Sequence, residues 1–435
     1  MNITHHRLSV ITWLAFALVS AAYLAQIPTA LRLVSDGIDY LLQASSALDG
    51  GGFRVHGERS MRPPGYPALI FLLAKAGMGW SWAIVALNCL LLGIGCWASY
   101  FVLRGSFGFQ AGAAQLTCLL TLLSFVMVKH VTYPLSDICF FGASTTCLLL
   151  LLQAQDGTQS RRFWRLLFAV PLMVFCIELR TIGVALIPAF VWAMVGGAIG
   201  ARKLAQRLPQ HRFASLLLFL LMLVVTAGIG RSFFHSRYLQ FNLPIFIKRG
   251  VLGTLASNLR DHTTEWGELT INAPVSKLPG VLELPVRIVG FLAMLLCATG
   301  IWQQRKKFDV VAWYMVGYAC VVLAYPWSDA RLWLPVLPLL IGYVSIGLRR
   351  MIPPDRLQPA ILAYCALFCL LGVAALAYST RLTFAGARFP DLYGDGRLAA
   401  TYRMAFRGGT PGEVNGINQD ALYLLRRYEW RLAVK

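Results

Sequence analysis

Long apolar segments alternate with short polar segments along the whole chain. The apolar segments are rich in Leu, Ala and Val and lack the strict alternation of barrel strands, so they predict helices. Their length is typical of helices that cross a bilayer. We expect eleven spans, at residues 8–34, 80–103, 111–128, 138–152, 168–177, 182–199, 213–229, 286–301, 310–325, 332–348 and 360–378. The segment 168–177 is barely long enough to cross. The pattern predicts an all-α polytopic membrane protein.

The composition agrees with this class. Hydrophobic residues make up 57% of the chain and charged residues only 13%, whereas soluble domains carry about 25% charge. The first span begins at Leu8, is longer than the core of a signal peptide and lacks a clear cleavage site of small residues. We therefore expect it to be a retained span.

The net charge of +20 allows two interpretations. In a soluble protein it would suggest nucleic acid as a partner. Here the basic residues gather in short loops on one predicted side, as cytoplasmic loops do, where they face anionic membrane lipids. They are Arg7, Arg104, Arg161, Arg162, Arg165, Arg202, Lys203, Arg207, Arg212, Arg305, Lys306, Lys307, Arg349, Arg350 and Arg356. We expect a cytoplasmic amino terminus and no nucleic-acid partner.

All ten cysteines lie in apolar segments or at their edges. This placement predicts small buried hydrophobic side chains rather than a disulfide framework or a zinc site.

The polar segments on the other predicted side form two outer loops, 35–67 and 231–284. In the first loop, residues 40–48 predict a helix lying at the membrane interface, and residues 68–76 predict a second helix after a Pro-rich turn. The second loop is too charged to cross the membrane and is expected to hold short helices. We find no internal repeat.

The last segment, 379–435, has nine Lys and Arg against five Asp and Glu. It is too short for a sizeable core of its own, so we expect it to pack on the outer loops as a periplasmic tail. The remainder, 1–378, is expected to form one transmembrane domain.

Charges of both signs gather at the outer membrane boundary, where an ionisable group is costly unless it is used or paired. The acids there are Asp36, Asp39, Asp137, Glu178 and Asp329, and the cations are Arg62, Lys129, Arg180 and Arg331. Arginine binds phosphate through a planar fork, while a carboxylate accepts a hydroxyl proton or holds a divalent metal. The chemistry suits a substrate with a phosphate and a hydroxyl.

Structural alternatives exist for these residues. Asp36 and Asp39 could cap a short helix, since Asp suits that position. Asp39 could also simply pair with Arg62. Tyr40 and Tyr66 could be aromatic residues of the interface belt. Arg180 could pair with Glu178.

Several motifs carry a resemblance to a known group. The first outer loop holds Ser35-Asp36-x-x-Asp39-Tyr40, then Gly51-Gly52-Phe53, then Arg62-Pro63-Pro64-Gly65-Tyr66-Pro67. Leu135-Ser136-Asp137, Leu179-Arg180-x-x-Gly183 and Arg331-Leu332-Trp333-Leu334-Pro335 follow in order. This series resembles the membrane-embedded class C glycosyltransferases, in particular bacterial relatives of protein O-mannosyltransferases and the lipid A aminoarabinose transferase.

The resemblance implies an inverting sugar transfer from a polyprenyl-phosphate donor to a lipid, glycan or protein acceptor on the outer face of the inner membrane. It implies that Asp36 is the catalytic base, with Asp39 beside it, and that Asp137 supports the site or binds a divalent metal such as Mg²⁺ or Mn²⁺. Arg331 maps to a phosphate-binding position. Together with the local chemistry, this gives Tyr40, Arg62, Tyr66, Lys129, Arg180 and Arg331 as substrate-binding candidates. No nucleotide is expected.

Two other classes stay open. A transporter or flippase of lipid-linked saccharides should show paired repeats and helices broken at the middle of the membrane. A non-catalytic assembly subunit could keep the same fold without the chemistry.

Overall fold

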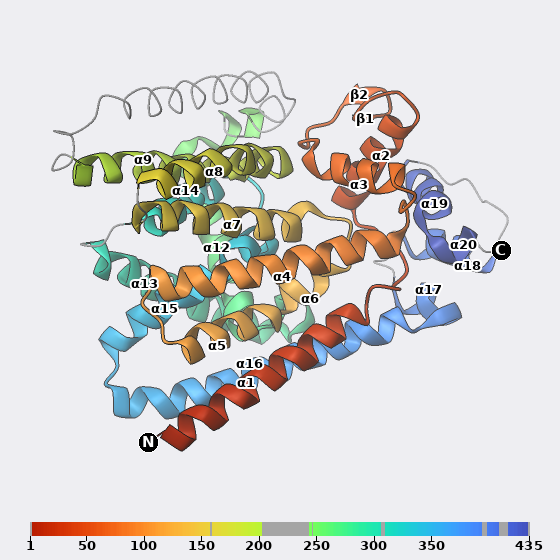
Figure 1. Ribbon diagram of the computed structural model, residues 1–435. Helices are drawn as coiled ribbons and strands as arrows, with labels where there is room; N and C mark the ends of the chain where they lie inside the picture. The colour runs from red at the N-terminus through yellow and green to blue at the C-terminus, as the bar shows by residue number, and fades with distance from the viewer. Residues whose placement is uncertain are drawn as a thin grey trace.

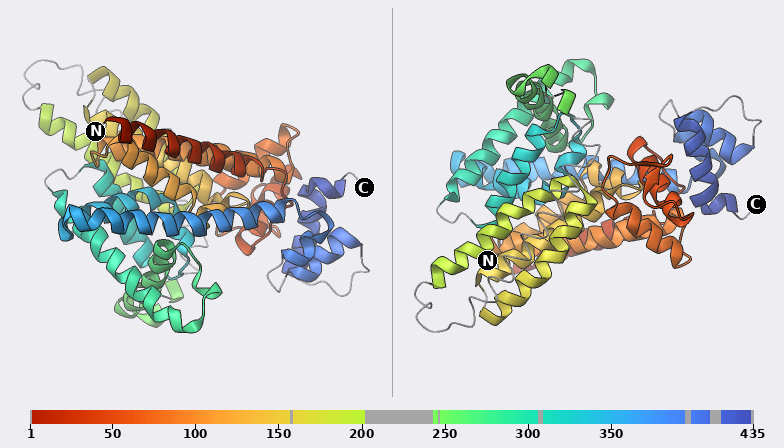
Figure 2. Two further views of the ribbon diagram at one scale, coloured as in Figure 1. Left: turned by 90° about the horizontal axis from the view of Figure 1, so that it is seen from below. Right: turned by 90° about the horizontal axis from the view of Figure 1, so that it is seen from above.

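The computed structural model describes residues 2–156, 159–201, 243–245, 247–305, 309–393, 398–408 and 416–433. The expected span 213–229 and the start of the second outer loop, 231–242, lie outside the described residues. The described part is a bundle of long helices with a smaller group of short elements at one end (Figure 1). The two chain ends lie at opposite ends of the molecule in Figures 1 and 2.

The bundle is built from helices and short 3₁₀ turns. They are α1 (Asn2–Leu24), α4 (Ser81–Gly105), α5 (Ala111–Leu122), α6 (Phe125–Val131), α7 (Ser136–Asp156), α8 (Gln159–Leu179), η1 (Thr181–Ala185), α9 (Leu186–Ala201), α12 (Val251–Ile271), η2 (Val275–Lys277), η3 (Gly280–Leu282), α13 (Glu283–Gln303), α14 (Val310–Ala324), η5 (Ala330–Val336), α15 (Leu337–Met351) and α16 (Pro354–Thr383).

Several of these helices have the length and hydropathy of membrane spans. Five segments of the described chain qualify alone, and a sixth does if α5 and α6 count as one bent span. Four shorter apolar helices lie within α1, α3 (Gly65–Lys75), η1–α9 and α14. The polytopic all-helical class is confirmed, while the number eleven is not.

The first predicted span is too long. Helix α1 ends at Leu24, and residues 25–34 form buried turns and irregular chain. Pro28 lacks the amide hydrogen that a continuing helix needs. Arg32, only 3% exposed, donates to hydroxyls of Thr29, Thr132, Ser379 and Thr383 and to the Ser379 carbonyl. This segment is therefore fixed to the C-terminal end of α16.

The third predicted span is broken. Helices α5 and α6 meet at an angle of 58°. Asn272, with a left-handed φ of 58°, supplies the polar partners at this break. Its side chain accepts from Phe125 N at 2.7 Å and donates to the carbonyls of Leu123 and Phe368, both at 2.9 Å. Sequence periodicity could not reveal the break, because the residue that satisfies it lies about 150 positions away.

Two further expectations on helix length are wrong. Helix α8 has 21 residues rather than the ten of the expected span, because it begins with the arginine-rich turn that was assigned to a loop. The second outer loop holds the 21-residue helix α12 rather than only short helices.

The short elements at one end come from the first outer loop and the tail. The loop contributes α2 (Ser35–Leu48), β1 (Arg54–Val55), β2 (Glu58–Arg59) and α3 (Gly65–Lys75). The tail contributes η6 (Gly386–Arg388), α17 (Phe389–Leu392), α18 (Ala399–Arg407), α19 (Ile417–Tyr428) and α20 (Trp430–Ala433). The two views in Figure 2 keep α2 and the tail together. The β-hairpin was not expected; His56 and Gly57 form its turn with φ of 50° and 79°.

The tail contacts the irregular segment after α1 and the helix α2. Tyr402 Oη donates to the Leu31 carbonyl at 2.8 Å and accepts from Leu33 N at 2.7 Å. The Arg427 guanidinium binds both carboxylate oxygens of Asp49. These contacts join the tail to the first-loop elements at the same end of the bundle.

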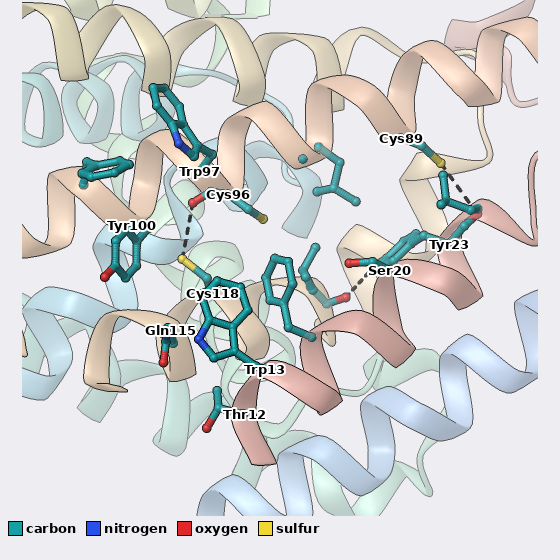
Figure 3. Close-up of a pocket in the computed structure, with 16 residues that line it drawn as sticks. Thr12, Trp13, Ser20, Tyr23, Cys89, Cys96, Trp97, Tyr100, Gln115 and Cys118 are labelled. Atoms are coloured by element: carbon teal, nitrogen blue, oxygen red, sulfur yellow. Dashed lines mark hydrogen bonds between the residues drawn. The ribbon is translucent and has the colours of Figure 1, made fainter. Parts of the chain in front are cut away.

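An apolar groove of about 470 Å³ lies between α1, α4 and α5 (Figure 3). Cys89, Cys96 and Cys118 line it, and Trp13 and Trp97 are more than half exposed along it. The two thiols of Cys89 and Cys118 donate to backbone carbonyls. The described cysteines are free thiols, so a disulfide framework is not present among them.

Candidate active site

The carboxylate of Asp36 lies between two guanidinium groups. Asp36 is in the first turn of α2, where the helix dipole favours an acid. Arg62 Nη2 donates to Oδ1 at 2.6 Å, and Arg331 Nη2 donates to Oδ2. Both oxygens therefore accept charge-assisted hydrogen bonds, which are the stronger kind.

Arg62 is held by two acids and a ring. Its Nε donates to Asp39 Oδ2 at 2.9 Å, while its Nη2 serves Asp36. Its guanidinium carbon lies 5.8 Å from the centroid of the Tyr40 ring, within the range of a cation–π contact. The guanidinium has one orientation because three neighbours fix it.

Arg331 is positioned by the turn that precedes it. Asp329 is the residue before η5, and its carboxylate accepts from Arg331 N at 3.0 Å. The same carboxylate lies 3.0 Å from Arg331 Nε. The turn from Asp329 to Arg331 thus directs the end of the Arg331 side chain toward Asp36.

A second ion pair joins Asp137 and Arg180. Asp137 lies in the first turn of α7 and its side chain is 3% exposed. Arg180 follows the end of α8 and donates to Asp137 Oδ1. The partner of Arg180 in this pair is therefore an acid 43 residues earlier in the chain.

Close packing brings α2 against the start of α7. A Cβ on Gly37 would lie 2.9 Å from Pro134 Cγ, so only glycine allows this approach without a shift of the proline ring. Tyr40 Oη and Ser136 Oγ are 3.0 Å apart, in hydrogen-bond contact. Asp36 and Asp137, each beside one of these contacts, are thereby brought to the same site.

The two ion-pair groups line one cavity of about 450 Å³. Its charged lining consists of Asp36, Asp137, Asp329, Arg62, Arg180 and Arg331, three acids and three arginines. Tyr40, Tyr325 and Trp327 add aromatic surface. A cavity with this lining can hold a phosphate and a polar ring and offers a carboxylate to a hydroxyl proton.

The electrostatic setting of Asp36 favours its ionised form. Burial acts to raise the pKa of this carboxyl group, but Arg331 and Arg62 act in the opposite direction and prevail. The net effect lowers the pKa of Asp36 below its usual value. The side chain is therefore ionised at neutral pH.

Not every expected site residue lines this cavity. Asp39 is linked to it through Arg62. Tyr66 is fully buried and packs edge-on behind Tyr40, with ring centroids 5.3 Å apart. Lys129 lies in α6 and lines a neighbouring cavity.

The residues at Asp137 do not fit a divalent metal. Its carboxylate already contacts the cationic Arg180. Within the described ranges, no three His, Cys, Asp or Glu side chains are grouped as a metal site requires. Asp137 is thus placed as the partner of an arginine.

Sequence reasoning missed one feature of the site. Asp329 was expected as an acid at the outer boundary but not as the residue that orients Arg331. Beside the site, Asp261, Glu265 and Glu268 line a neighbouring cavity from one face of α12, and their spacings of four and three residues are visible in the sequence.

Neither a protein-family model nor a curated protein matches this sequence. Solved structures do match. The crystal structure of ArnT from Cupriavidus metallidurans in the apo state has a TM-score of 0.56 and 14% identity, covering 97% of this chain and 85% of that chain. The crystal structure of the same ArnT bound to undecaprenyl phosphate has a TM-score of 0.50 and 16% identity, covering 91% of this chain and 68% of that chain.

A third similar structure is the Archaeoglobus fulgidus oligosaccharyltransferase in complex with Zn and sulfate. Its TM-score is 0.50 at 11% identity, covering 94% of this chain and 61% of that chain. The protein has the class C glycosyltransferase fold. The fold implied by the sequence motifs is confirmed, and at these identities the activity has to be argued from the site itself.

Proposed function

We propose that the protein is an inverting glycosyltransferase that moves a sugar from a polyprenyl-phosphate donor to a hydroxyl of a lipid, glycan or protein acceptor. One observation supports this most strongly. The carboxylate of Asp36 and the guanidinium groups of Arg62, Arg180 and Arg331 line a single cavity. The fold shared with ArnT, one structure of which holds undecaprenyl phosphate, agrees with such a donor.

The reaction needs a base and a site for the leaving phosphate. The acceptor oxygen bonds to the anomeric carbon while the bond from that carbon to the phosphate oxygen breaks. The acceptor proton passes to the Asp36 carboxylate, and the polyprenyl phosphate leaves with the bonding electrons. Arg331 and Arg62 stabilise the charge that develops on it.

Donor binding frees the base. In the described structure both oxygens of Asp36 accept from arginines. A phosphate that binds Arg331 or Arg62 competes for the same N–H groups. When it takes one of them, the Asp36 carboxylate regains an oxygen for the acceptor hydroxyl. The carboxylate is therefore a free base only after the donor is in place.

The other candidates have supporting roles in this proposal. Asp39 and Tyr40 hold Arg62, and Asp137 holds Arg180. Tyr66 supports the Tyr40 ring. We assign no metal to Asp137, because its carboxylate forms an ion pair with Arg180.

In this proposal the site lies outside the cytoplasm. The site lies at the end of the bundle that carries the tail, opposite the amino terminus (Figure 1). The positive-inside rule assigns the arginine-rich loops to the cytoplasm, which puts the cavity and the 379–435 tail in the periplasm.

The test uses the purified protein in proteoliposomes with an undecaprenyl-phosphate-linked sugar carrying a radiolabel. Mass spectrometry of envelope glycans and lipid-linked sugars, with and without the gene, first identifies the sugar and the acceptor. We expect label in the acceptor and release of undecaprenyl phosphate. Movement of the intact donor between leaflets without its cleavage would instead indicate a flippase.

A further inference from the structure

Arg331 is carried by a short piece of backbone that is weak by itself. The 3₁₀ helix η5 runs for seven residues, and Pro335 within it has no amide hydrogen to donate. Hydrogen bonds in 3₁₀ helices have poor geometry, and runs of more than about four residues are uncommon. The side chain of Asp329 is 49% exposed, so its ion pair with Arg331 contributes little alone. Contacts from other elements are therefore needed to fix η5.

Two buried hydrogen bonds join η5 to two different helices. Trp333, 2% exposed, donates its Nε1 hydrogen to Glu265 Oε2 of α12 at 2.9 Å. One residue earlier, the carbonyl of Leu332 accepts from Tyr318 Oη of α14. Glu265 and Tyr318 are buried as well, so water does not replace a lost partner. The backbone that directly follows Arg331 is thus tied to α12 and α14.

The helices α12 and α14 are themselves joined by polar side chains. His262, one turn before Glu265, contacts Glu265 Oε2 through Nδ1 at 2.6 Å and the Val322 carbonyl through Nε2 at 3.3 Å. Asn258, another turn earlier, donates to two carbonyls at the end of α14, at 2.8 and 2.6 Å. The two supports of η5 are therefore fixed relative to each other just before the turn that leads to Arg331.

Three rings surround the indole of Trp333. The ring centroids of Trp266, His262 and Tyr318 lie 5.2, 5.5 and 6.3 Å from it. This packing fixes the plane of the indole and directs its N–H toward Glu265. Trp266 in the same cluster differs, because its Nε1 is buried without a hydrogen-bond partner among the described residues.

We propose that Glu265 and Tyr318 are positioning residues for sugar transfer, which act through η5 to hold Arg331 against Asp36 and toward the donor phosphate. Neither side chain is among the described residues that line the proposed active-site cavity, so both act at a distance from the substrate. This inference rests on the proposed function, because the phosphate bound by Arg331 belongs to it.

The pKa of Asp36 reports where Arg331 lies. The guanidinium of Arg331 acts to lower this pKa, so an Arg331 that moves away lets it rise. Asp36 acts as a base only when ionised, and the acidic limb of the kcat/KM profile then moves to higher pH. A general loss of stability reduces the amount of active protein without moving the limb. Four further charged side chains line the cavity and are retained in every variant below: Arg62, Arg180, Asp137 and Asp329.

The test uses the full-length protein in proteoliposomes with the labelled donor. W333F removes the indole N–H and retains an aromatic ring. We expect its acidic limb to move to higher pH and its kcat to fall about tenfold, since a hydrogen bond to a charged group is lost. In an R331Q background, W333F should change neither quantity further, because the residue through which it acts is absent. Y318F should act as W333F does and covers the case in which W333F does not fold.

The matched control is W266F, the same substitution in the same cluster, which removes an N–H without a partner among the described residues. Its acidic limb should coincide with that of the wild type. An unmoved limb in W333F, or in Y318F where W333F does not fold, overturns the inference and leaves the proposed function in place. An equal shift in W266F, or a W333F effect that persists in full beside R331Q, does the same. A wild type that transfers no sugar overturns both.

Discussion

Asp36 and Arg331 form an ion pair across 295 residues of sequence. One belongs to the first turn of α2 and the other to the 3₁₀ segment after α14. The same carboxylate also binds Arg62, so the proposed base and two proposed phosphate ligands neutralise one another in the free protein. In the proposed reaction, donor binding rearranges this group.

Replacing Arg331 should alter the pH dependence of transfer. Arg331 contributes to the lowered pKa of Asp36, so R331Q should raise it. The base acts only when ionised, and activity is lost as the pH falls through its pKa. The acidic limb of the kcat/KM profile should therefore move to higher pH, with kcat lower by about 10²–10³-fold through loss of phosphate stabilisation.

The matched control for this experiment is R349Q, which removes an arginine at the far end of α15. Its pH profile should follow that of the wild type. An acidic limb that stays in place in R331Q would show that Asp36 is not the group that titrates.

Removing one member of the Asp137–Arg180 pair should destabilise the protein strongly. R180M leaves a carboxylate that is 3% exposed without its cation, which costs about 3–5 kcal/mol in buried pairs. The double variant D137N/R180M should recover most of this stability, because no buried charge remains. Thermal unfolding in detergent measures both, and a double variant no more stable than R180M would contradict the pairing.

Asn272 should be essential to the bent third span. N272A removes three hydrogen bonds and leaves Phe125 N and the Leu123 carbonyl without that partner. Each unsatisfied buried group costs about 1–3 kcal/mol, so a clear loss of thermal stability is expected. Q358A, which removes an exposed amide at the start of α16, is the control. Equal unfolding temperatures for the two variants would show that the break does not depend on Asn272.

Much of the fold followed from the sequence. Hydropathy predicted the long helices, because lipid-facing segments must be apolar and satisfy their backbone internally. The break after Leu122, the end of α1 at Leu24 and the length of α8 were not predicted. At the break, the side chain of Asn272 accepts a hydrogen bond from the backbone of Phe125. The segment after α1 is held by Arg32, which donates to hydroxyl groups of α16. Both depend on contacts between distant segments, which a local pattern does not contain.

For the site, the sequence predicted Asp36, Arg62 and Arg331, which line one cavity, but not their partners. Asp36 with Arg331 and Asp137 with Arg180 are tertiary pairings. Tyr66 belongs to the Pro-rich motif and was expected to bind substrate. Its side chain is fully buried behind Tyr40, and a sequence motif does not reveal such burial. The hydrogen bond between Trp333 and Glu265 was not predicted either, because it joins segments 68 residues apart.

The most direct test of the account is the transfer rate of purified D36N with the labelled polyprenyl-phosphate sugar, beside D39N. The amide that replaces the Asp36 carboxylate keeps the shape of the side chain but cannot take the proton from the acceptor hydroxyl. For D36N we predict a fall in kcat of about 10²–10⁴-fold with donor binding retained. For D39N we predict mainly a higher KM for the donor, because the contact with Arg62 is lost. A D36N protein that transfers sugar at the wild-type rate would contradict the assignment of Asp36 as the base.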